Sequence, residues 1–469
     1  MSLMLQIKTT NWLTVFKNAV RGKQANPTEG PIVPAIITLA VPMVLEMLME
    51  SLFAVVNIFW VAHLGAAATA AIGLTETLLS VIYTVAAGLS IGVMAVVARR
   101  IGERDEEGAS DAAFQTILLG LGVALVLGVL GGVFAHDLLR IMGADDNVLR
   151  VGGTFATIML SGNGAIVLIF LLNAAFRGSA DATVAMRVLW IANAINLVLD
   201  PCLIFGLGPF PRLGVTGTAV ATTTGRSIGV LVQLYVLFGG RARLKLAARH
   251  IHVHLKVMLH VLRLSASGML QVFSATASWI GLVRVLSSFG SDALAGYTIA
   301  IRIVMFALLP AWGVANAAAT MVGQSLGAKL PERAEQSVWI AGFINLLFLG
   351  SLGIVFMAAA PFITHQFGGD VATTAYAVRC LRIVSAGFFF YAYGMVLNNS
   401  FNGAGDTRTP TLLNLFCFWL WELPVAWLLS RHLDMGPTGV FAAIMLAFSM
   451  LAVLAAILWR RGKWKLVKV

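Results

Sequence analysis

Charged side chains are scarce in this chain of 469 residues, in which Asp, Glu, Lys and Arg together make up 11%. Apolar residues make up 59%, and the mean hydropathy is +0.88. A water-soluble globule of this length needs more polar surface, so the composition indicates a protein whose solvent is lipid. Apolar stretches longer than about 18 residues recur and do not alternate, which favours membrane-spanning helices over a β-barrel.

Cysteine is also scarce. Cys202, Cys380 and Cys417 lie in apolar stretches without paired spacing, which argues against a disulfide framework and a zinc site, so we interpret them as small core residues. No metal or organic cofactor is expected. The N-terminus lacks a short apolar core followed by a small-residue cleavage site. Residues 1–29 are instead expected to form a basic amphipathic segment on the cytoplasmic surface.

The net charge of +11 does not predict a nucleic-acid partner, because the basic residues sit at the ends of apolar stretches. Most of them fall in one alternating set of loops and in the two termini. The other set of loops carries only Arg140, Arg150, Arg212 and Arg431. By the positive-inside rule both termini are cytoplasmic, which requires an even number of spans.

Twelve transmembrane helices are predicted, which makes the chain an all-α membrane protein. We place them near residues 33–62, 69–99, 110–135, 150–176, 184–206, 215–239, 257–288, 293–325, 335–362, 373–401, 410–430 and 437–460. The second and eighth are long enough to require tilt, a kink or extension beyond the bilayer. Proline residues inside four helices are candidate bends, at positions 42, 201, 310 and 424.

An internal repeat appears when the sequence is compared with itself at an offset of 225 residues. Glycines and two loop aspartates coincide: Gly65 with Gly290, Gly88 with Gly313, Gly178 with Gly403, and Asp181 with Asp406. We interpret this as a duplication. The offset spans six helices, so the halves are parallel repeats, here two pseudo-symmetric six-helix bundles, and substrate is expected between them near the midplane. The predicted parts are an N-lobe at 30–240, a cytoplasmic basic linker at 241–256 and a C-lobe at 257–469.

Several short motifs together resemble the multidrug and toxic compound extrusion (MATE) family of bacterial transporters. They are Val-Asn-Ile-Phe-Trp-Val-Ala-His-Leu-Gly at 56–65, Arg-Gly-Ser-Ala-Asp at 177–181, Asn-Gly-Ala-Gly-Asp-Thr-Arg-Thr-Pro at 402–410, and Asn-Leu-Val-Leu-Asp-Pro at 196–201. The resemblance covers roughly residues 30–460. It implies a V-shaped pair of bundles around a central cavity, and cation-coupled antiport of amphiphilic, often cationic, compounds in a bacterial inner membrane.

Coupling to an ion gradient needs ionisable groups near the membrane midplane, where they are costly enough to be functional candidates. Asp200 is the leading proton site, because Asn193 and Asn196 share its helix face and can hydrogen-bond it in either protonation state. Much of this assignment rests on the resemblance. The alternative is an aspartate that merely satisfies backbone groups freed by Pro201.

A second polar face is predicted on the first helix. Glu46, Glu50 and Asn57 lie four and eleven residues apart and so return to one side of a helix. Two neighbouring glutamates repel when both are ionised, so at least one is expected to hold a proton, and the pair suits cationic drugs. The resembling family commonly has aspartate where this chain has Asn57, so other groups must carry that role here. The alternative pairs one glutamate with a basic residue near a helix end.

Candidate substrate-cavity residues are Gln271, Glu76, Trp279, Tyr391 and Asn173. Aromatic side chains in such a cavity would stack on drugs, although core or lipid-facing positions are commoner. The seventh and tenth helices contain no Asp or Glu. Sodium-coupled members of the family are associated with carboxylates in the second half, so the resemblance favours protons, with sodium as an alternative.

Other functions are less well supported. A lipid-linked precursor flippase of related fold would need a more cationic cavity. A membrane enzyme would need a nucleophile facing a base or a zinc motif, and neither is recognisable. His250, His252 and His254 alternate in the linker without a nearby cysteine or carboxylate in sequence, which favours a solvated loop over a metal site. A monomer in the lipid bilayer, binding small amphiphilic molecules, is expected.

Overall fold

The computed structural model describes residues 11–22, 26–62, 64–240 and 242–467, and its regular elements are all helices. Residues 1–10 of the predicted N-terminal segment lie outside this description. Two compact units are present. Unit 1 comprises residues 1–44 and 266–469, and unit 2 comprises residues 45–265. Helices α3 and α11 each contribute residues to both units, whereas the predicted lobe boundaries fall at 240 and 257.

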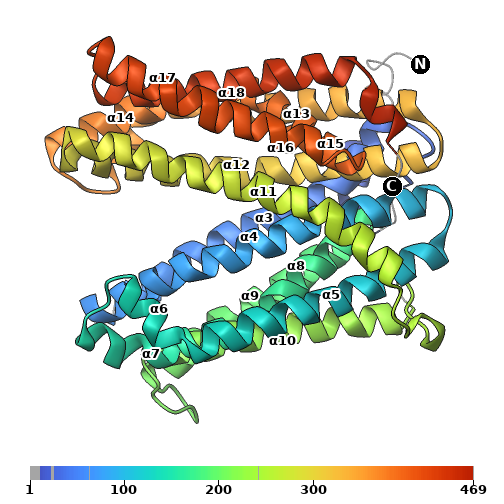
Figure 1. The fold of residues 1–469 in the computed structure, drawn as a ribbon, viewed down its shortest axis with the longest axis horizontal. Coiled ribbons are helices and arrows are strands. Elements are labelled where there is room, and N and C mark those ends of the chain that lie inside the picture. The colour runs from blue at the N-terminus through green and yellow to red at the C-terminus, as the bar shows by residue number, and fades with distance from the viewer. Residues whose placement is uncertain (1–10, 23–25, 63, 241, 468–469) are drawn as a thin grey trace. The chain divides into compact units, whose positions relative to one another are not determined.

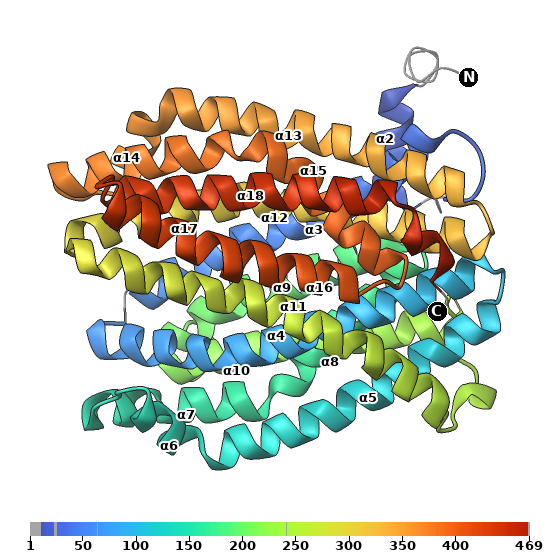
Figure 2. The same cartoon turned by 45° about the horizontal axis from the view of Figure 1, so that its top comes forward.

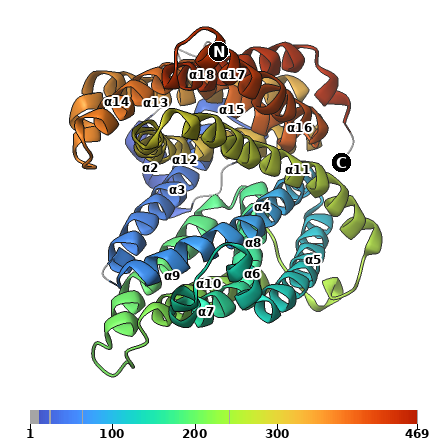
Figure 3. The ribbon, with the colours of Figure 1, turned by 60° about the vertical axis from the view of Figure 1, so that its left-hand side comes forward.

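Unit 2 is a bundle of long helices, drawn from blue to green in Figure 1. Its helices are α3 (Ile32–Ala62, from residue 45), α4 (Ala66–Gly102), α5 (Glu106–Val133), α6 (Ala135–Ile141), α7 (Asp146–Ser161), α8 (Asn163–Gly178), α9 (Ala182–Phe205) and α10 (Val215–Phe238), followed by a short turn, η1 (Ala248–His250), and the start of α11 (Leu255–Leu286). α4 packs against α5, α7 and α8, and α10 packs against α7, α8 and α9. Figure 3 shows α5 beside α4 and α8.

Unit 1 repeats this arrangement with the helices after α11, drawn from yellow to red, and it also includes α2 and the first part of α3, drawn in blue (Figure 1 and Figure 2). Its helices are α2 (Trp12–Arg21), η2 (Ser287–Phe289), α12 (Ser291–Gly327), α13 (Pro331–His365), α14 (Val371–Ala386), α15 (Phe388–Gly403), α16 (Arg408–Asn414), η3 (Leu415–Glu422), α17 (Leu423–Trp427), η4 (Leu428–His432), α18 (Pro437–Arg460) and η5 (Lys463–Leu466). α12 packs against α13, α14 and α15, and α18 packs against α14, α15 and α17. Figure 2 shows α13, α14 and α18 running side by side.

The two units therefore share one contact topology, in which α4 corresponds to α12, α5 to α13, α7 and α8 to α14 and α15, and α10 to α18. α4 and α12 are each 37 residues long. Both begin after a glycine in a conformation that only glycine adopts readily, Gly65 with φ 92° and Gly290 with φ 103°. The predicted long second and eighth helices and the two parallel six-helix bundles are confirmed.

The predicted helices 150–176 and 373–401 are each broken in the middle. α7 and α8 meet at 41°, and α14 and α15 meet at 56°, on either side of Gly162 and Gly387. These glycines are again 225 residues apart. The first helix of each pair starts at an equivalent aspartate cap, where Asp145 accepts from the Val148 backbone N at 2.7 Å and Asp370 from the Thr373 backbone N at 2.8 Å.

Within the described residues, nine helices are long and apolar enough to cross a membrane, and the two bent pairs raise this number to eleven. α10 is as long as α9 and α18, at 24 residues each. Its middle carries Thr222, Arg226 and Gln233, which lower its hydropathy. α10 is therefore not counted among the nine, although its length equals that of two helices that are.

Small residues allow the helices of each unit to approach closely. A Cβ atom added at Gly178 on α8 would lie 2.9 Å from the Met94 carbonyl oxygen on α4, and one added at Gly403 on α15 would lie 2.2 Å from the Ala319 carbonyl oxygen on α12. Both the glycines and their neighbours are 225 residues apart. The repeat therefore preserves a backbone-to-backbone contact at the same point in both units.

The segment before α3 is held by Arg333 at the start of α13. Its guanidinium group donates to the carbonyl oxygens of Pro27 (2.7 Å), Glu29 (2.9 Å) and Gly30 (2.9 Å). The preceding helix, α2, exposes Leu13 and Phe16 and carries Lys17 and Arg21. This amphipathic pattern matches the type of segment predicted for the N-terminus.

Candidate functional site

Asp200 lies in the interior of unit 2, on α9, with 1% of its surface exposed. With the Asn196 amide oriented to satisfy its neighbours, the amide nitrogen donates to Asp200 Oδ2 at 2.7 Å. The amide oxygen then accepts from Thr222 Oγ1 at 2.8 Å and from the Thr222 backbone N at 3.0 Å. Asp200 Oδ1 has no hydrogen-bond partner among the described residues.

Close packing of α10 on α9 creates this cluster. A Cβ atom at Gly225 would lie 2.7 Å from the Ala192 carbonyl oxygen and 3.5 Å from Asn196 Cβ. Only glycine permits that approach, and it places Thr222, one turn earlier on α10, against Asn196. Pro201 leaves the carbonyl of residue 197 without its helical donor. Only a protonated Asp200 has a hydrogen to donate to that carbonyl, so the alternative role of this aspartate stays open.

Glu50 belongs to a second cluster in the same unit. Its Oε2 accepts from Asn193 Nδ2 at 3.3 Å, and its Oε1 lies 3.9 Å from Arg226 Nη2. Arg226 also donates to the Tyr83 hydroxyl at 2.9 Å, with its guanidinium carbon 5.5 Å from the centre of the tyrosine ring. The pairing of one glutamate with a basic residue, left open by the sequence, thus occurs at Glu50. Its partner lies in the middle of a helix instead of at a helix end.

Glu46, one turn before Glu50 on α3, heads a third chain of polar groups. Its side chain is 1% exposed, and Oε1 accepts from Asn173 Nδ2 at 3.1 Å. The Asn173 oxygen accepts in turn from Gln233 Nε2 at 2.6 Å. Glu46 Oε2 has no hydrogen-bond partner in the described part of the chain. Asn173, predicted to line the substrate cavity, is therefore a partner of a predicted coupling residue.

Five of the six predicted coupling residues lie in clusters that contain a side chain of α10. They are Asp200, Asn196, Asn193, Glu50 and Glu46. Asn57 lies further along α3. Its oxygen is buried and has no partner among the residues described.

Sequence reasoning missed the α10 contribution. Thr222, Arg226 and Gln233 are spaced by four and seven residues, so they share one helix face. Polar residues at helical spacing also defined the polar faces of α3 and α9 in the sequence. A search for polar residues at helical spacing, as well as for acids, would have found them.

The remaining cavity candidates lie in different places. Gln271 on α11 is buried, and its Oε1 has no partner among the described residues, while Trp279, two turns later, is half-buried. Tyr391 on α15 stacks on Phe448 of α18, with ring centres 3.9 Å apart. Glu76 is exposed on α4. Gln271, Trp279 and Tyr391 belong to unit 1, whereas Glu76 belongs to unit 2.

One more buried acid is found in unit 1. Glu422 is 1% exposed, and its Oε2 has no hydrogen-bond partner within the described ranges. It ends the π-helical segment η3, just before Pro424. Arg284 on α11 and Arg302 on α12 are both exposed.

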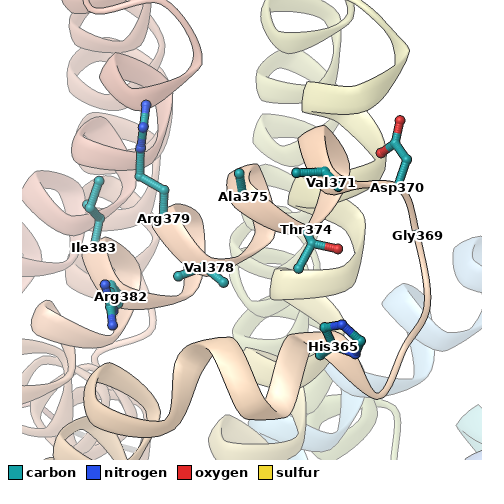
Figure 4. A pocket seen from close by; sticks show the side chains of 10 residues that line it. All are labelled: His365, Gly369, Asp370, Val371, Thr374, Ala375, Val378, Arg379, Arg382 and Ile383. Carbon is teal, nitrogen blue, oxygen red and sulfur yellow. The ribbon is translucent and has the colours of Figure 1, made fainter.

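A pocket of about 680 Å³ opens between the end of α13 and the start of α14 in unit 1. Figure 4 shows His365, Asp370, Thr374, Arg379 and Arg382 around it. Arg382 also donates to the Met357 carbonyl oxygen at 3.1 Å, and Arg379 donates to Thr438 Oγ1 at 3.3 Å. None of the predicted coupling or cavity residues lines this pocket, so we do not assign the substrate to it.

The sequence offered no carboxylate near the linker histidines, but the structure places two beside them. His252 and His254 contact Asp111, and His250 contacts Glu107, both on α5. Chain folding brings these acids from more than a hundred residues away, which is why local spacing could not reveal them. Asp181, just before α9, accepts from the Arg243 backbone N of the linker at 2.7 Å. Asp406 does cap the following turn, accepting from the Thr409 backbone N at 3.2 Å.

Two parallel helical repeats with buried carboxylates in a polar network define a multi-pass membrane transporter. The sequence model of the MatE family matches the chain twice, at residues 42–202 and 269–428. The chain therefore belongs to the MatE family, a family of transporters and not of enzymes. The double match also agrees with the duplication seen in the fold.

Known relatives cover nearly the whole chain. It is 25% identical to "Probable multidrug resistance protein YoeA" of Bacillus subtilis, over 87% of this chain and 89% of that protein. It is 24% identical to "FAD transporter" of Shewanella oneidensis, over 88% and 91%. A solved structure described as "Outward-facing conformation of a multidrug resistance MATE family transporter of the MOP superfamily" is 26% identical, with a TM-score of 0.88 over 94% of this chain and 98% of that one. The predicted family and fold class are confirmed.

Proposed function

We propose that this protein exports amphiphilic, cationic small molecules in exchange for protons, by alternating access between the two sides of the membrane. Family membership and the multidrug resistance names of relatives such as YoeA support an export role. The buried carboxylates of unit 2 support the coupling. Asp200, Glu46 and Glu50 are the proposed coupling acids, positioned by Asn196, Asn193 and other amides.

The observation that carries the proposal is the state of the carboxylate oxygens. Asp200 Oδ1 and Glu46 Oε2 are buried and have no partner among the described residues, while the other oxygen of each accepts from an amide. A buried carboxylate without compensation costs several kcal/mol, so such a group favours neutralisation. Amide partners tolerate both charge states. These acids are therefore suited to gain a proton on one side and lose it on the other.

The geometry around Asp200 favours a proton over sodium. Hard metal cations require several oxygen ligands. Here the Asn196 amide presents its nitrogen to Asp200, because its oxygen is occupied by two donors from Thr222. A sodium ion would need that amide to reverse, which keeps a bond to Thr222 Oγ1 at 2.8 Å, with Asn196 Nδ2 as donor, but loses the bond from the Thr222 backbone N. A proton needs only the free Oδ1.

The proposed substrate class follows from the negative charge that two glutamates give to one face of α3. Glu46 and Glu50 are acids one turn apart, Arg226 Nη2 lies 3.9 Å from Glu50 Oε1, and Arg177 acts on Glu46 electrostatically. An amphiphilic cation would be attracted to this face and displace its proton, which links binding to coupling. Gln271, Trp279, Tyr391, Glu76 and Asn173 remain our proposed lining of the route, with Asn57 at the far end of the same helix.

We place the protein in the bacterial cell membrane as a monomer, with both termini in the cytoplasm. The positive-inside distribution of lysine and arginine supports this orientation. The proposed lobes are residues 30–240 and 257–469, joined by a linker at 241–256 that lies on the cytoplasmic side.

The test is transport in proteoliposomes that carry an imposed gradient of protons or of sodium. We expect a proton gradient alone to drive movement of a fluorescent cationic dye. Asp200→Asn should abolish gradient-driven transport, and Glu46→Gln should reduce it. Asp137→Asn, an exposed aspartate of the same unit, is the matched control and should transport like the wild type.

Two results would overturn the proposal. Sodium alone driving transport would exclude protons as the coupling ion. Gradient-driven movement of FAD or of a lipid-linked pyrophosphate, without movement of cationic dyes, would favour the nucleotide-carrier or flippase alternatives over drug export.

A further inference from the structure

The linker between the two repeats is attached to the start of α5 by side-chain contacts. Gln115 donates from Nε2 to the His252 carbonyl oxygen at 2.8 Å, and its Oε1 accepts from the His254 backbone N at 3.0 Å. One turn earlier, Ser110 Oγ accepts from the Lys245 backbone N at 3.2 Å. Gln115 therefore holds the backbone of His252 and His254 in a fixed register over α5. Figure 1 shows this loop, in yellow-green, beside α5.

Three metal-binding side chains converge where the linker crosses α5. His254 Nδ1 lies 2.7 Å from Asp111 Oδ2 and 3.4 Å from His252 Nε2. His252 Nε2 lies 3.6 Å from Asp111 Oδ1. Ligand atoms around a tetrahedral zinc ion, with bonds of about 2.0–2.1 Å, lie about 3.3 Å apart. With one carboxylate oxygen taken from Asp111, the three ligand atoms lie within 4.8 Å of one another, so small side-chain movements would bring them to the spacing of one face of a metal coordination tetrahedron.

Neighbouring groups orient the ligands as metal sites require. His252 Nδ1 lies 2.9 Å from the Arg249 carbonyl oxygen, which can only accept a hydrogen bond. The hydrogen of a neutral His252 therefore sits on Nδ1, and the lone pair of Nε2 points into the cluster. Gln115 Nε2 also donates to Asp111 Oδ1 at 3.0 Å. Such outer hydrogen bonds fix ring orientation and carboxylate position in known metal sites.

With both histidines neutral, the cluster has more hydrogen-bond acceptors than hydrogens. The lone pair of His252 Nε2 and the carboxylate of Asp111 both face His254 Nδ1, which can offer one hydrogen. One hydrogen cannot satisfy these acceptors well at once. A metal ion that replaces it would bond to Nε2, Nδ1 and a carboxylate oxygen together.

We propose that Asp111, His252 and His254 form a binding site for a divalent transition-metal ion of the zinc type, which fastens the inter-repeat linker to α5. Two imidazoles and one carboxylate select zinc, cobalt, nickel or copper over magnesium and calcium, which prefer oxygen ligands. With three protein ligands, a fourth position stays open to water. Both histidines are exposed, so the ion can enter from the aqueous side.

The test uses the intact, tag-free protein in detergent, titrated with cobalt(II) and zinc(II). Cobalt in a tetrahedral site with nitrogen and oxygen ligands gives visible absorption bands, and zinc displaces it. We expect one ion per chain in the wild type, and a loss of affinity of about tenfold or more in each of Asp111→Asn, His252→Ala and His254→Ala. Magnesium should not compete.

Two controls separate ligation from general disturbance of the loop. His250→Gln alters a neighbouring histidine that contacts Glu107 and not the cluster, and His365→Ala alters a histidine of unit 1; both should bind one ion normally. Gln115→Met removes an orienting group and not a ligand, so it should weaken binding less than loss of a ligand does.

The proposal is wrong if the wild type binds no cobalt or zinc at micromolar concentration. It is equally wrong if the three ligand variants bind as the wild type does, or if His250→Gln and His365→Ala lose binding to the same extent. The metal titration does not depend on transport. The drug-export proposal can therefore be wrong while the metal site is correct, and the metal site can be wrong while the drug-export proposal is correct.

Discussion

Replacing Gly403 by alanine should destabilise unit 1, because the added Cβ atom would meet backbone. It would lie 2.2 Å from the Ala319 carbonyl oxygen and 2.7 Å from that residue's carbonyl carbon and Cα. Neither rotamer change nor side-chain movement can relieve a contact with backbone. α15 and α12 must therefore separate locally by about 1.2 Å to reach an ordinary contact distance, and overpacking of this kind costs about 3 kcal/mol.

The equivalent change in unit 2 should cost less. At Gly178 the Cβ atom would lie 2.9 Å from the Met94 carbonyl oxygen, so only a small shift is needed, at about 1 kcal/mol. For units of this size, each kcal/mol lowers the unfolding midpoint by about 2–4 °C. We expect a decrease of about 6–12 °C for Gly403→Ala and about 2–4 °C for Gly178→Ala.

A thiol-reactive fluorescent dye in detergent is the assay, because Cys380 and Cys417 are buried and become reactive on unfolding. Gly122→Ala is the control: this glycine lies inside α5 with open space around its Cα. Alanine there should leave stability unchanged or raise it by about 0.5–1 kcal/mol. Equal midpoints for Gly403→Ala and wild type, or an equal loss in Gly122→Ala, would refute the packing argument.

Three further predictions concern single contacts. Hydrogen bonds from Thr373 lower the pKa of Asp370, so the ionised cap stabilises α14 above about pH 4 and this stabilisation is lost as the pH falls below that range. The difference in unfolding midpoint between the wild type and Asp370→Ala should therefore disappear in acid. Arg333→Ala should speed tryptic cleavage within α2, seen by gel electrophoresis, and unchanged cleavage would contradict the tether. Arg226→Leu should lower the unfolding midpoint more than Arg226→Leu combined with Glu50→Gln, since the single change leaves a carboxylate unpaired.

Much of the fold was predictable because membrane helices are defined by local composition. The prediction of 184–206 for α9 compares with Ala182–Phe205, and that of 215–239 for α10 with Val215–Phe238. The breaks at Gly162 and Gly387 were not predicted. A helix that bends in the middle can have the same hydropathy as a straight one. Bends were predicted at prolines, whereas these two breaks lie at glycines that occupy the same position in both repeats.

The site was predictable in part. Acids within apolar helices are rare, so Asp200, Glu46 and Glu50 were identified from composition and helical spacing, although the assignment of their roles remains a prediction. Arg226 was not predicted, because it lies in the middle of an apolar helix and only acids were considered as ionisable coupling groups at such positions. The partners of the linker histidines depend on how the chain returns to α5, which no local pattern encodes.

We propose that buried carboxyl groups of unit 2 give up a proton when substrate binds. Adding a cationic substrate to purified protein in weakly buffered detergent solution, with a pH indicator present, would reveal this release. We expect release by the wild type and by Asp137→Asn, and little or none by a variant that combines Asp200→Asn with Glu46→Gln. Substrate binding without proton release, or equal release by the combined variant, would contradict this proposal.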